Sequence, residues 1–331
     1  MKKILLILIC IFALTGCYNY YELDELDVAS SILVEHNDGK YDVTVEVYDE
    51  KKTKTVKASG KTLTEAFENA DRKTAKNIYY RHLNAILLTE DVDIKEVVYF
   101  FFRNPDTNDN FAFVYTTETD IYTDKDKNIG ELINNNLKQN EMFTFFEIMK
   151  NFTNKTRDLT FPIFDGKRFT GIKTLKGTKI IGTLDEKEDN ILMPLINKTG
   201  TYLDTKCDDD ERHFVIKIDS VDTDYKVDKK IKVKVKIEAS LRELTCDIDT
   251  SKVEGLKKLE KIANDDFKDK VYSLINKFKE DKTDTLGINT LINDKYHNLD
   301  KRFYDFDYEV ETEISIYKKG LLLKWKRTLI F

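Results

Sequence analysis

The common catalytic and metal-binding motifs are missing from this 331-residue sequence. Cys-x-x-Cys, His-Glu-x-x-His and Gly-x-Ser-x-Gly do not occur in it. The chain has only four histidines, and no two of them have the spacing of metal ligands: His36, His82, His213 and His297. Gly60-Lys61-Thr62 is similar to the end of a phosphate loop, but such a loop needs a glycine at position 55, which is Thr55. We therefore expect no catalytic residue, no metal site and no cofactor, and predict that the protein is not an enzyme.

Long hydrophobic runs are also scarce. Beyond Ile11, no apolar run approaches the roughly 20 residues that a membrane-spanning helix needs. The longest apolar stretch, Ile4–Phe12, follows Lys2 and Lys3 and is too short to span a bilayer. A positive start, a short apolar core and small residues before a boundary are typical of a secretory signal peptide, which we place at residues 1–16.

The residues around the predicted cleavage site indicate lipidation. Leu14-Thr15-Gly16-Cys17 resembles the lipobox of bacterial lipoproteins. The resemblance implies cleavage between Gly16 and Cys17, an S-diacylglycerol group on the Cys17 thiol and an N-acyl (N-palmitoyl) group on its new amino terminus. Two or three acyl chains bind a membrane firmly, since each buried methylene contributes roughly 0.8 kcal/mol. We expect a folded body held on a membrane lipid through Cys17.

Net positive charge is lacking as well. The formal net charge is −6, and cleavage after Gly16 removes Lys2 and Lys3 but no acidic residue. A net acidic domain repels phosphate backbones, so we expect no nucleic-acid partner. It gains little from an anionic membrane surface, which leaves the anchoring to the lipid on Cys17.

Cysteine is rare, with four residues in the whole chain. Cys10 leaves with the signal peptide, and Cys17 is the expected lipid attachment site. Cys207 and Cys246 remain, in an exported protein where a disulfide is chemically allowed. Two cysteines fix no framework and their separation cannot be read from sequence, so a bridge and two free thiols are both open.

The first half of the chain alternates between strand and helix patterns. Tyr41, Val43, Val45 and Val47 alternate with polar neighbours, which predicts a strand with one buried face. Thr62 and Glu65 have the spacing of a capping box, which predicts a helix start at Thr62 with reciprocal bonds. The sequence further predicts a buried strand over 82–88, a helix from Ile94 to Phe102 that ends before Pro105, a strand over 111–117 and a helix over 129–140. Residues 150–165 have no clear pattern, Phe169–Leu184 reads as strand, turn and strand, and Asp185–Asn190 as a charged turn.

The second half begins after the polar, turn-rich segment 197–212. Ile231, Val233, Val235 and Ile237 alternate with lysines, the clearest strand period in the chain. Apolar residues at steps of three and four then predict a long helix over 251–281. A last strand over 306–316 has the half-buried alternation of an antiparallel sheet.

Together these patterns predict an α+β fold, with several subdomains of mixed or antiparallel sheets packed with helices, on an N-terminal lipid anchor. We predict a signal peptide at 1–16, an N-terminal domain at 18–197 and a C-terminal domain at 198–331.

Several segments, taken in order, resemble the Ger(x)C family, the lipoprotein C subunits of GerA-type nutrient germinant receptors. Cys17-Tyr18-Asn19 with Glu22–Leu26 resembles the opening of the mature family members. Gly60-Lys61-Thr62-Leu63 through His82-Leu83 resembles the family's GKTL helix and following strand. Arg103–Asp106, Lys179–Leu184 and Asp284-Thr285-Leu286-Gly287 resemble its RDPE turn, its K.VG.L element and its DIFGFG motif. The chain departs from the family at Tyr18, Asn19 and Arg81, and lacks the closing tryptophan.

This resemblance implies a lipoprotein on the outer face of the inner spore membrane. It implies assembly with a multi-span A subunit and a permease-like B subunit, in a complex that senses nutrients and triggers germination. Two other classes of exported protein agree less well with the sequence. A solute-binding lipoprotein of an ABC-type importer would favour alternating β and α units with parallel sheets around a cleft, which the alternation at 231–237 and 306–316 argues against. A secreted hydrolase lacks its catalytic set.

Overall fold

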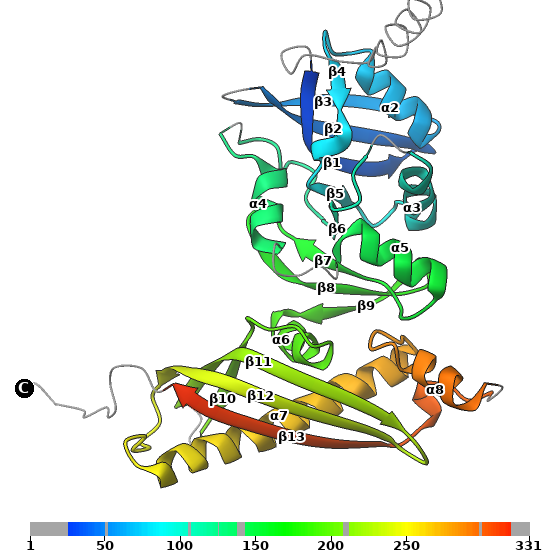
Figure 1. The fold of residues 1–331 in the computed structure, drawn as a ribbon. Helices are drawn as coiled ribbons and strands as arrows, with labels where there is room; N and C mark the ends of the chain where they lie inside the picture. Colours follow the sequence, from blue (N-terminus) through cyan, green and yellow to red (C-terminus); the bar gives the residue numbers. More distant parts are fainter. Residues whose placement is uncertain are drawn as a thin grey trace, which may run out of the picture.

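The structure is a computed structural model that describes residues 26–49, 52–104, 107–124, 126–137, 143–207, 212–297 and 300–318. The described chain forms two mixed β-sheets packed with helices, which confirms the predicted α+β class. Figure 1 shows sheet A with its helices in the upper part of the molecule, here called the N-terminal unit. The second sheet, sheet B, lies below it with α7 (Val253–Asp281) and α8 (Ile288–Tyr296), and this part is called the C-terminal unit. The predicted boundary at 197/198 falls between α6 and β10 and stays a prediction.

Sheet A holds nine strands in the order β3-β2-β1-β5-β6-β7-β8-β9, with β4 also paired to β1. Its strands are β1 (Leu26–Asn37), β2 (Lys40–Asp49), β3 (Lys52–Gly60), β4 (Asn77–Tyr79), β5 (Ala85–Leu88), β6 (Ala112–Tyr115), β7 (Thr160–Phe164), β8 (Phe169–Lys176) and β9 (Lys179–Asp185). β1, β5, β6 and β7 run parallel, while hairpins at both sides add antiparallel pairs. The short 3₁₀ helix η2 (Tyr80–His82) links β4 to β5.

Helices cover both faces of sheet A, because its central strands are apolar on both sides. α2 (Leu63–Asp71), α3 (Ile94–Arg103) and α5 (Phe145–Asn154) pack against one face, and α4 (Ile129–Leu137) against the other. The helix over 129–140 is thus confirmed in type, while β7 and the second half of α5 lie in the segment 150–165 that showed no pattern.

Glu46 of β2 is a charged residue on the face of sheet A that α4 covers. The sequence placed it on the solvent side of its strand, yet it is 1% exposed. Its carboxylate accepts hydrogen bonds from the Ser31 hydroxyl at 2.6 Å and from the amides of Ile129 and Gly130 at 2.8 and 3.0 Å. Glu46 therefore caps the start of α4 from inside the sheet. Burial raises the pKa of the Glu46 carboxyl, and these hydrogen bonds partly offset that rise.

Two helix starts differ in detail from the sequence prediction. Thr62 accepts from the amide of Glu65 as expected, but the Glu65 carboxylate accepts from the amide of Lys61 instead of Thr62. The charged segment after β9 is α6 (Glu186–Leu195), not a turn. Asp185 and Glu188 form its capping box, a signal that the sequence contained and the prediction missed.

Sheet B has the order β10-β11-β12-β13. Its strands are β10 (Tyr202–Lys206), β11 (His213–Val227), β12 (Ile231–Leu244) and β13 (Tyr308–Lys318), and the chain also forms α7 (Val253–Asp281), α8 (Ile288–Tyr296) and the 3₁₀ helix η4 (Phe303–Asp305). The expectation of an antiparallel last strand is wrong, because β13 runs parallel to β12. α7 returns the chain to the end of the sheet where β12 began, and such a crossover makes the next strand parallel.

α7 also covers the outer edge of β13. The amides of Val310, Ile314 and Ile316 donate to the Tyr272 hydroxyl, Asn264 Oδ1 and Glu260 Oε1 at 3.0, 3.0 and 2.9 Å. These three acceptors lie on one side of α7, at steps of four and eight residues. An edge strand with unpaired amides can recruit other chains, and α7 removes that hazard here.

Candidate interaction sites

Cys17, the one residue for which the sequence predicted chemistry, lies outside the described residues. The four histidines lie in different parts of the fold: His36 in β1, His82 in η2, His213 in β11 and His297 after α8. Among the residues that the structure describes, no three His, Cys, Asp or Glu side chains are grouped so that they could hold a metal ion. No helix in the described part of the chain is long and apolar enough to cross a membrane.

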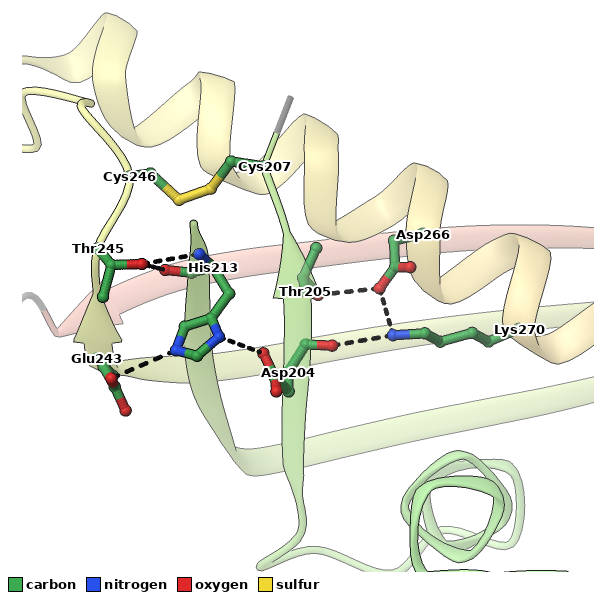
Figure 2. A network of polar contacts seen from close by, with 9 residues as sticks. All are labelled: Asp204, Thr205, Cys207, His213, Glu243, Thr245, Cys246, Asp266 and Lys270. Atoms are coloured by element: carbon green, nitrogen blue, oxygen red, sulfur yellow. Dashed lines mark hydrogen bonds and ion pairs between the residues drawn. A yellow bond between two sulfur atoms is a disulfide. The ribbon is translucent and has the colours of Figure 1, made fainter. Parts of the chain in front are cut away.

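The question left open for the two remaining cysteines is answered by a disulfide between Cys207 and Cys246, with Cα atoms 6.3 Å apart. Figure 2 shows that it joins the end of β10 to the segment that follows β12. The bridge therefore links the end of the edge strand β10 to the segment after β12, although β11 lies between these two strands in the sheet.

His213 reinforces the same corner of sheet B (Figure 2). Its backbone pairs with the Thr245 hydroxyl, the amide donating at 2.7 Å and the carbonyl accepting at 2.9 Å. Its ring lies between two carboxylates, with Nδ1 3.6 Å from Asp204 and Nε2 3.3 Å from Glu243. One histidine thus connects β10, β11 and β12.

A small cavity of about 310 Å³ lies beside this corner, between α6, β10 and α7. Lys270 of α7 donates to Asp266 Oδ2 at 2.6 Å and to the backbone carbonyl of Asp204 at 2.9 Å (Figure 2). The Thr205 hydroxyl donates to Asp266 at 3.0 Å. Because these polar groups satisfy one another, the arrangement ties α7 to the edge strand β10 and is suited to holding structure.

The Asp284-Thr285-Leu286-Gly287 motif forms part of the contact between the two units. Asp284 caps α8, its carboxylate oxygens accepting from the amides of Ile288 and Asn289 at 2.8 and 2.7 Å. Burial raises the pKa of Asp284 to about 6, although the amide hydrogen bonds partly offset that rise. Gly287 adopts φ +76°, and a Cβ there would lie 3.0 Å from the Thr156 carbonyl oxygen of the N-terminal unit. The motif therefore combines a helix cap with a close approach between units.

Further polar contacts join the units around this motif. The Thr290 hydroxyl of α8 donates to the Thr156 carbonyl at 2.8 Å. Lys277 of α7 lies 2.7 Å from both Glu188 carboxylate oxygens and donates to the Thr183 carbonyl of β9 at 2.8 Å. Gly182 belongs to the segment Lys179–Leu184, which resembles the family's K.VG.L element. A Cβ at Gly182 would lie 2.9 Å from Asp281 Oδ2. Two of the motifs that suggested the family thus lie at the contact between the two units.

A further candidate interaction site, on α3 and α5, was not predicted from the sequence. Phe102 is the last of the apolar residues that predicted the helix from Ile94 to Phe102, and it is 56% exposed. Tyr99 beside it and Phe146 of α5 are also exposed. The signal was present, because α3 carries more apolar residues than one buried face can use.

Comparison with known proteins matches nearly all of the chain expected after signal cleavage. Residues 19–165 match the spore germination protein N-terminal domain. Residues 170–320 match the C-terminal domain described as spore germination B3/GerAC like.

Individual relatives agree with this match. Spore germination protein GerQC of Bacillus cereus is 24% identical over 325 residues, covering 88% of this chain and 90% of the relative. Spore germination protein KC of Bacillus subtilis (strain 168) is 25% identical over 173 residues, covering 47% of this chain and 40% of the relative. The crystal structure of the GerBC protein has a similar fold, with a TM-score of 0.55 and 17% identity over 86% of this chain and 96% of that one. With both family domains present in order, the chain belongs to the Ger(x)C family, the germinant-receptor C subunits of spore germination.

Proposed function

We propose that this protein is the lipid-anchored C subunit of a nutrient germinant receptor and is needed for spore germination in response to nutrients. It acts by assembling with a multi-span A subunit and a permease-like B subunit, not by catalysis. The observation that carries the proposal is the pair of germination-family domains, which together extend from residue 19 to residue 320.

The position of the first described strand fits an anchor at Cys17. Leu26, where β1 starts, follows Cys17 by nine residues. An extended chain rises at most 3.3–3.6 Å per residue, so nine residues can separate Leu26 from Cys17 by no more than roughly 30 Å. A protein held in this way stays close to the outer face of the inner spore membrane, within reach of membrane subunits.

Two variants of the full-length protein test the anchor. Cys17→Ala should abolish acyl labelling and move the protein out of the membrane fraction. Cys10→Ala is the matched control, because it changes a cysteine in the signal peptide and should leave labelling unchanged. Unaltered labelling of Cys17→Ala would refute the anchor.

A deletion strain tests the receptor role. Its spores should fail to respond to one class of nutrient, while germination by routes that bypass nutrient receptors persists. A full nutrient response, in a strain without related receptors, would refute the role. The importer hypothesis has lost support, because both halves of the chain match germination domains. It would regain support if the deletion abolished uptake of a solute and left germination intact.

A further inference from the structure

Exposed aromatic side chains of α3 lie beside α5. Tyr99 and Phe102 of α3 are 38% and 56% exposed, and Phe146 of α5 is 53% exposed. The rings of Tyr99 and Phe152 meet edge to face at 5.6 Å, so the two helices are neighbours here. We call Tyr99, Phe102 and the two hollows beside them the Tyr99 surface. Clustered exposed apolar groups of this kind usually mark an interaction site.

Two hollows flank α3. The larger, about 680 Å³, lies between the start of α2 and α3 and includes Leu63, Tyr99, Phe100 and Arg103 in its lining. The smaller, about 300 Å³, lies between α3 and α5 and includes Tyr99, Phe102, Met149 and Phe152. Tyr99 borders both, so it lies between a hollow with charged side chains in its lining and one without them.

The acidic and the basic side chains of the larger hollow differ in whether they have partners within the protein. Asp93 accepts from the amides of Lys95 and Glu96 as the cap of α3, and Glu96 accepts from the Tyr41 hydroxyl. Lys95 and Arg103 lie over the Tyr99 ring, 6.0 and 5.6 Å from its centroid. Within the described residues, neither cation has a carboxylate at ion-pair distance. The carboxylates of Asp93 and Glu96 therefore already accept hydrogen bonds within the protein, whereas the Lys95 and Arg103 side chains can form ion pairs with a partner protein.

We propose that the Tyr99 surface binds an amphipathic helix of a receptor membrane subunit, with carboxylates facing Lys95 and Arg103 and apolar side chains in the hollow beside Phe102. Lys95, Tyr99 and Arg103 are spaced four residues apart, so they form one stripe that a helix can follow. Helix-in-groove recognition uses this combination of apolar anchors and a charged rim. The inference rests on the proposed function, which supplies the membrane subunits.

A bilayer fits this surface less well than a helix does. Membrane-bound surfaces insert protruding apolar groups into a flat interface. Here Met149, Phe152 and Phe100 line hollows and are only partly exposed. A convex partner such as a helix fills hollows, and anionic lipid is kept as an outcome of the test.

The test uses the full lipoprotein, tagged and purified with its A and B subunits from membranes of the producing strain. Lys95→Glu with Arg103→Glu should lower the recovery of the membrane subunits at least about tenfold, since reversal of central charges at an interface opposes binding. The matched control is Lys257→Glu with Lys261→Glu, two exposed lysines of α7 that give the same change in net charge. Lys95→Arg with Arg103→Lys keeps the charge and should keep the association.

A second measurement leaves both cations in place. A photo-crosslinking phenylalanine analogue at position 102 should give a product with the A or B subunit, and the same analogue at Tyr202, which is 49% exposed on β10, should not. This measurement also decides the matter if the double glutamate variant fails to fold, as judged by circular dichroism.

The outcomes separate the two proposals. If the wild-type protein recovers neither subunit, the proposed function fails, and this inference fails with it. If wild-type and double glutamate protein recover them equally, or position 102 gives no product with either subunit, only the Tyr99 surface is refuted. If the charge reversal instead abolishes binding of unlipidated protein to phosphatidylglycerol vesicles while subunit recovery is unchanged, the surface binds lipid and the inference is wrong.

Discussion

Asp158 and Asp284, 126 residues apart in the sequence, hold each other across the contact between the two units. The amide of Asp158 donates to the carbonyl of Asp284 at 3.0 Å, and the amide of Asp284 donates to the Asp158 carboxylate at 2.6 Å. The other oxygen of that carboxylate accepts from the amide of Gly177 at 3.3 Å. One side chain thus fastens the loop after α7 to both the start of β7 and the β8–β9 turn.

Asp158→Ala should weaken this connection. It removes the acceptor of a part-buried amide, which costs about 1–3 kcal/mol in the free energy of unfolding. Amide exchange at residues 283–289 should become faster, as mass spectrometry can measure. The control Asp269→Ala changes an exposed carboxylate of α7 and should alter stability by less than about 0.5 kcal/mol. Unchanged exchange in Asp158→Ala would contradict this role.

Asp189 of α6 makes stability depend on pH. Burial, with a smaller contribution from Glu186, raises the pKa of this carboxyl to about 7. Within the described structure its Oδ1 is buried without a hydrogen-bond partner. Since the ordinary pKa is 3.8, the folded state binds more protons between about pH 4 and 7, so this group lowers stability as the pH rises through that window.

Asp189→Asn should therefore be more stable than the wild type at pH 8, by roughly 1–2 kcal/mol, with the difference vanishing near pH 4. Thermal unfolding of both proteins at several pH values measures it. Asp269→Asn should show no such trend. A variant that is less stable than the wild type at pH 8 would show that the ionised carboxylate has a favourable partner.

The Cys207–Cys246 disulfide should contribute measurably to the stability of the C-terminal unit. It links positions 39 residues apart, and the chain-entropy estimate for a loop of that length is about 3–4 kcal/mol. Dithiothreitol should lower the midpoint of thermal unfolding of the wild type. The Cys207→Ser, Cys246→Ser double variant should already have the lower midpoint and be insensitive to the reductant. Equal midpoints for oxidised and reduced wild type would refute the contribution.

The contact of α7 with the edge of β13 predicts that Asn264 protects the Ile314 amide. Asn264→Ala removes the acceptor of the Ile314 amide and should cost about 1–2 kcal/mol in the free energy of unfolding. Amide exchange at Ile314 should accelerate more than at Val310, whose acceptor is Tyr272. Asn264→Asp keeps an oxygen at that position and should preserve slow exchange at Ile314. Equal exchange at Ile314 in the alanine variant and the wild type would mean that the cover is dispensable.

Sequence patterns predicted best the elements with one buried face. The alternation at 231–237 and the apolar period of 251–281 correspond to β12 and α7. They failed for residues whose burial depends on a helix that packs on the other face of the sheet. Glu46 looked like a solvent-facing residue, because nothing in its own strand shows that α4 packs on that face.

The candidate surfaces were predictable to different degrees. The family motif at 284–287 was visible in sequence, but its role as a cap and a contact needs the distant Asp158 and Thr156. Phe102 contributed to the pattern that predicted a helix, but its exposure could not be predicted, because periodicity does not separate an apolar residue that faces the protein interior from one that faces solvent or a partner. The direction of β13 was misread because alternation reports burial and not strand direction.

α7 lies against one edge of each sheet, since its Lys277 binds the β9 carbonyl of Thr183 while its other side covers β13. The N-terminal unit alone therefore lacks the helix that contacts the outer edge of its last strand. An N-terminal fragment ending near residue 197 would present the outer edge of β9 to solvent, where further strands can add to it. We expect such a fragment to self-associate into β-rich aggregates on isolation, so fragments intended for study of this protein should retain α7.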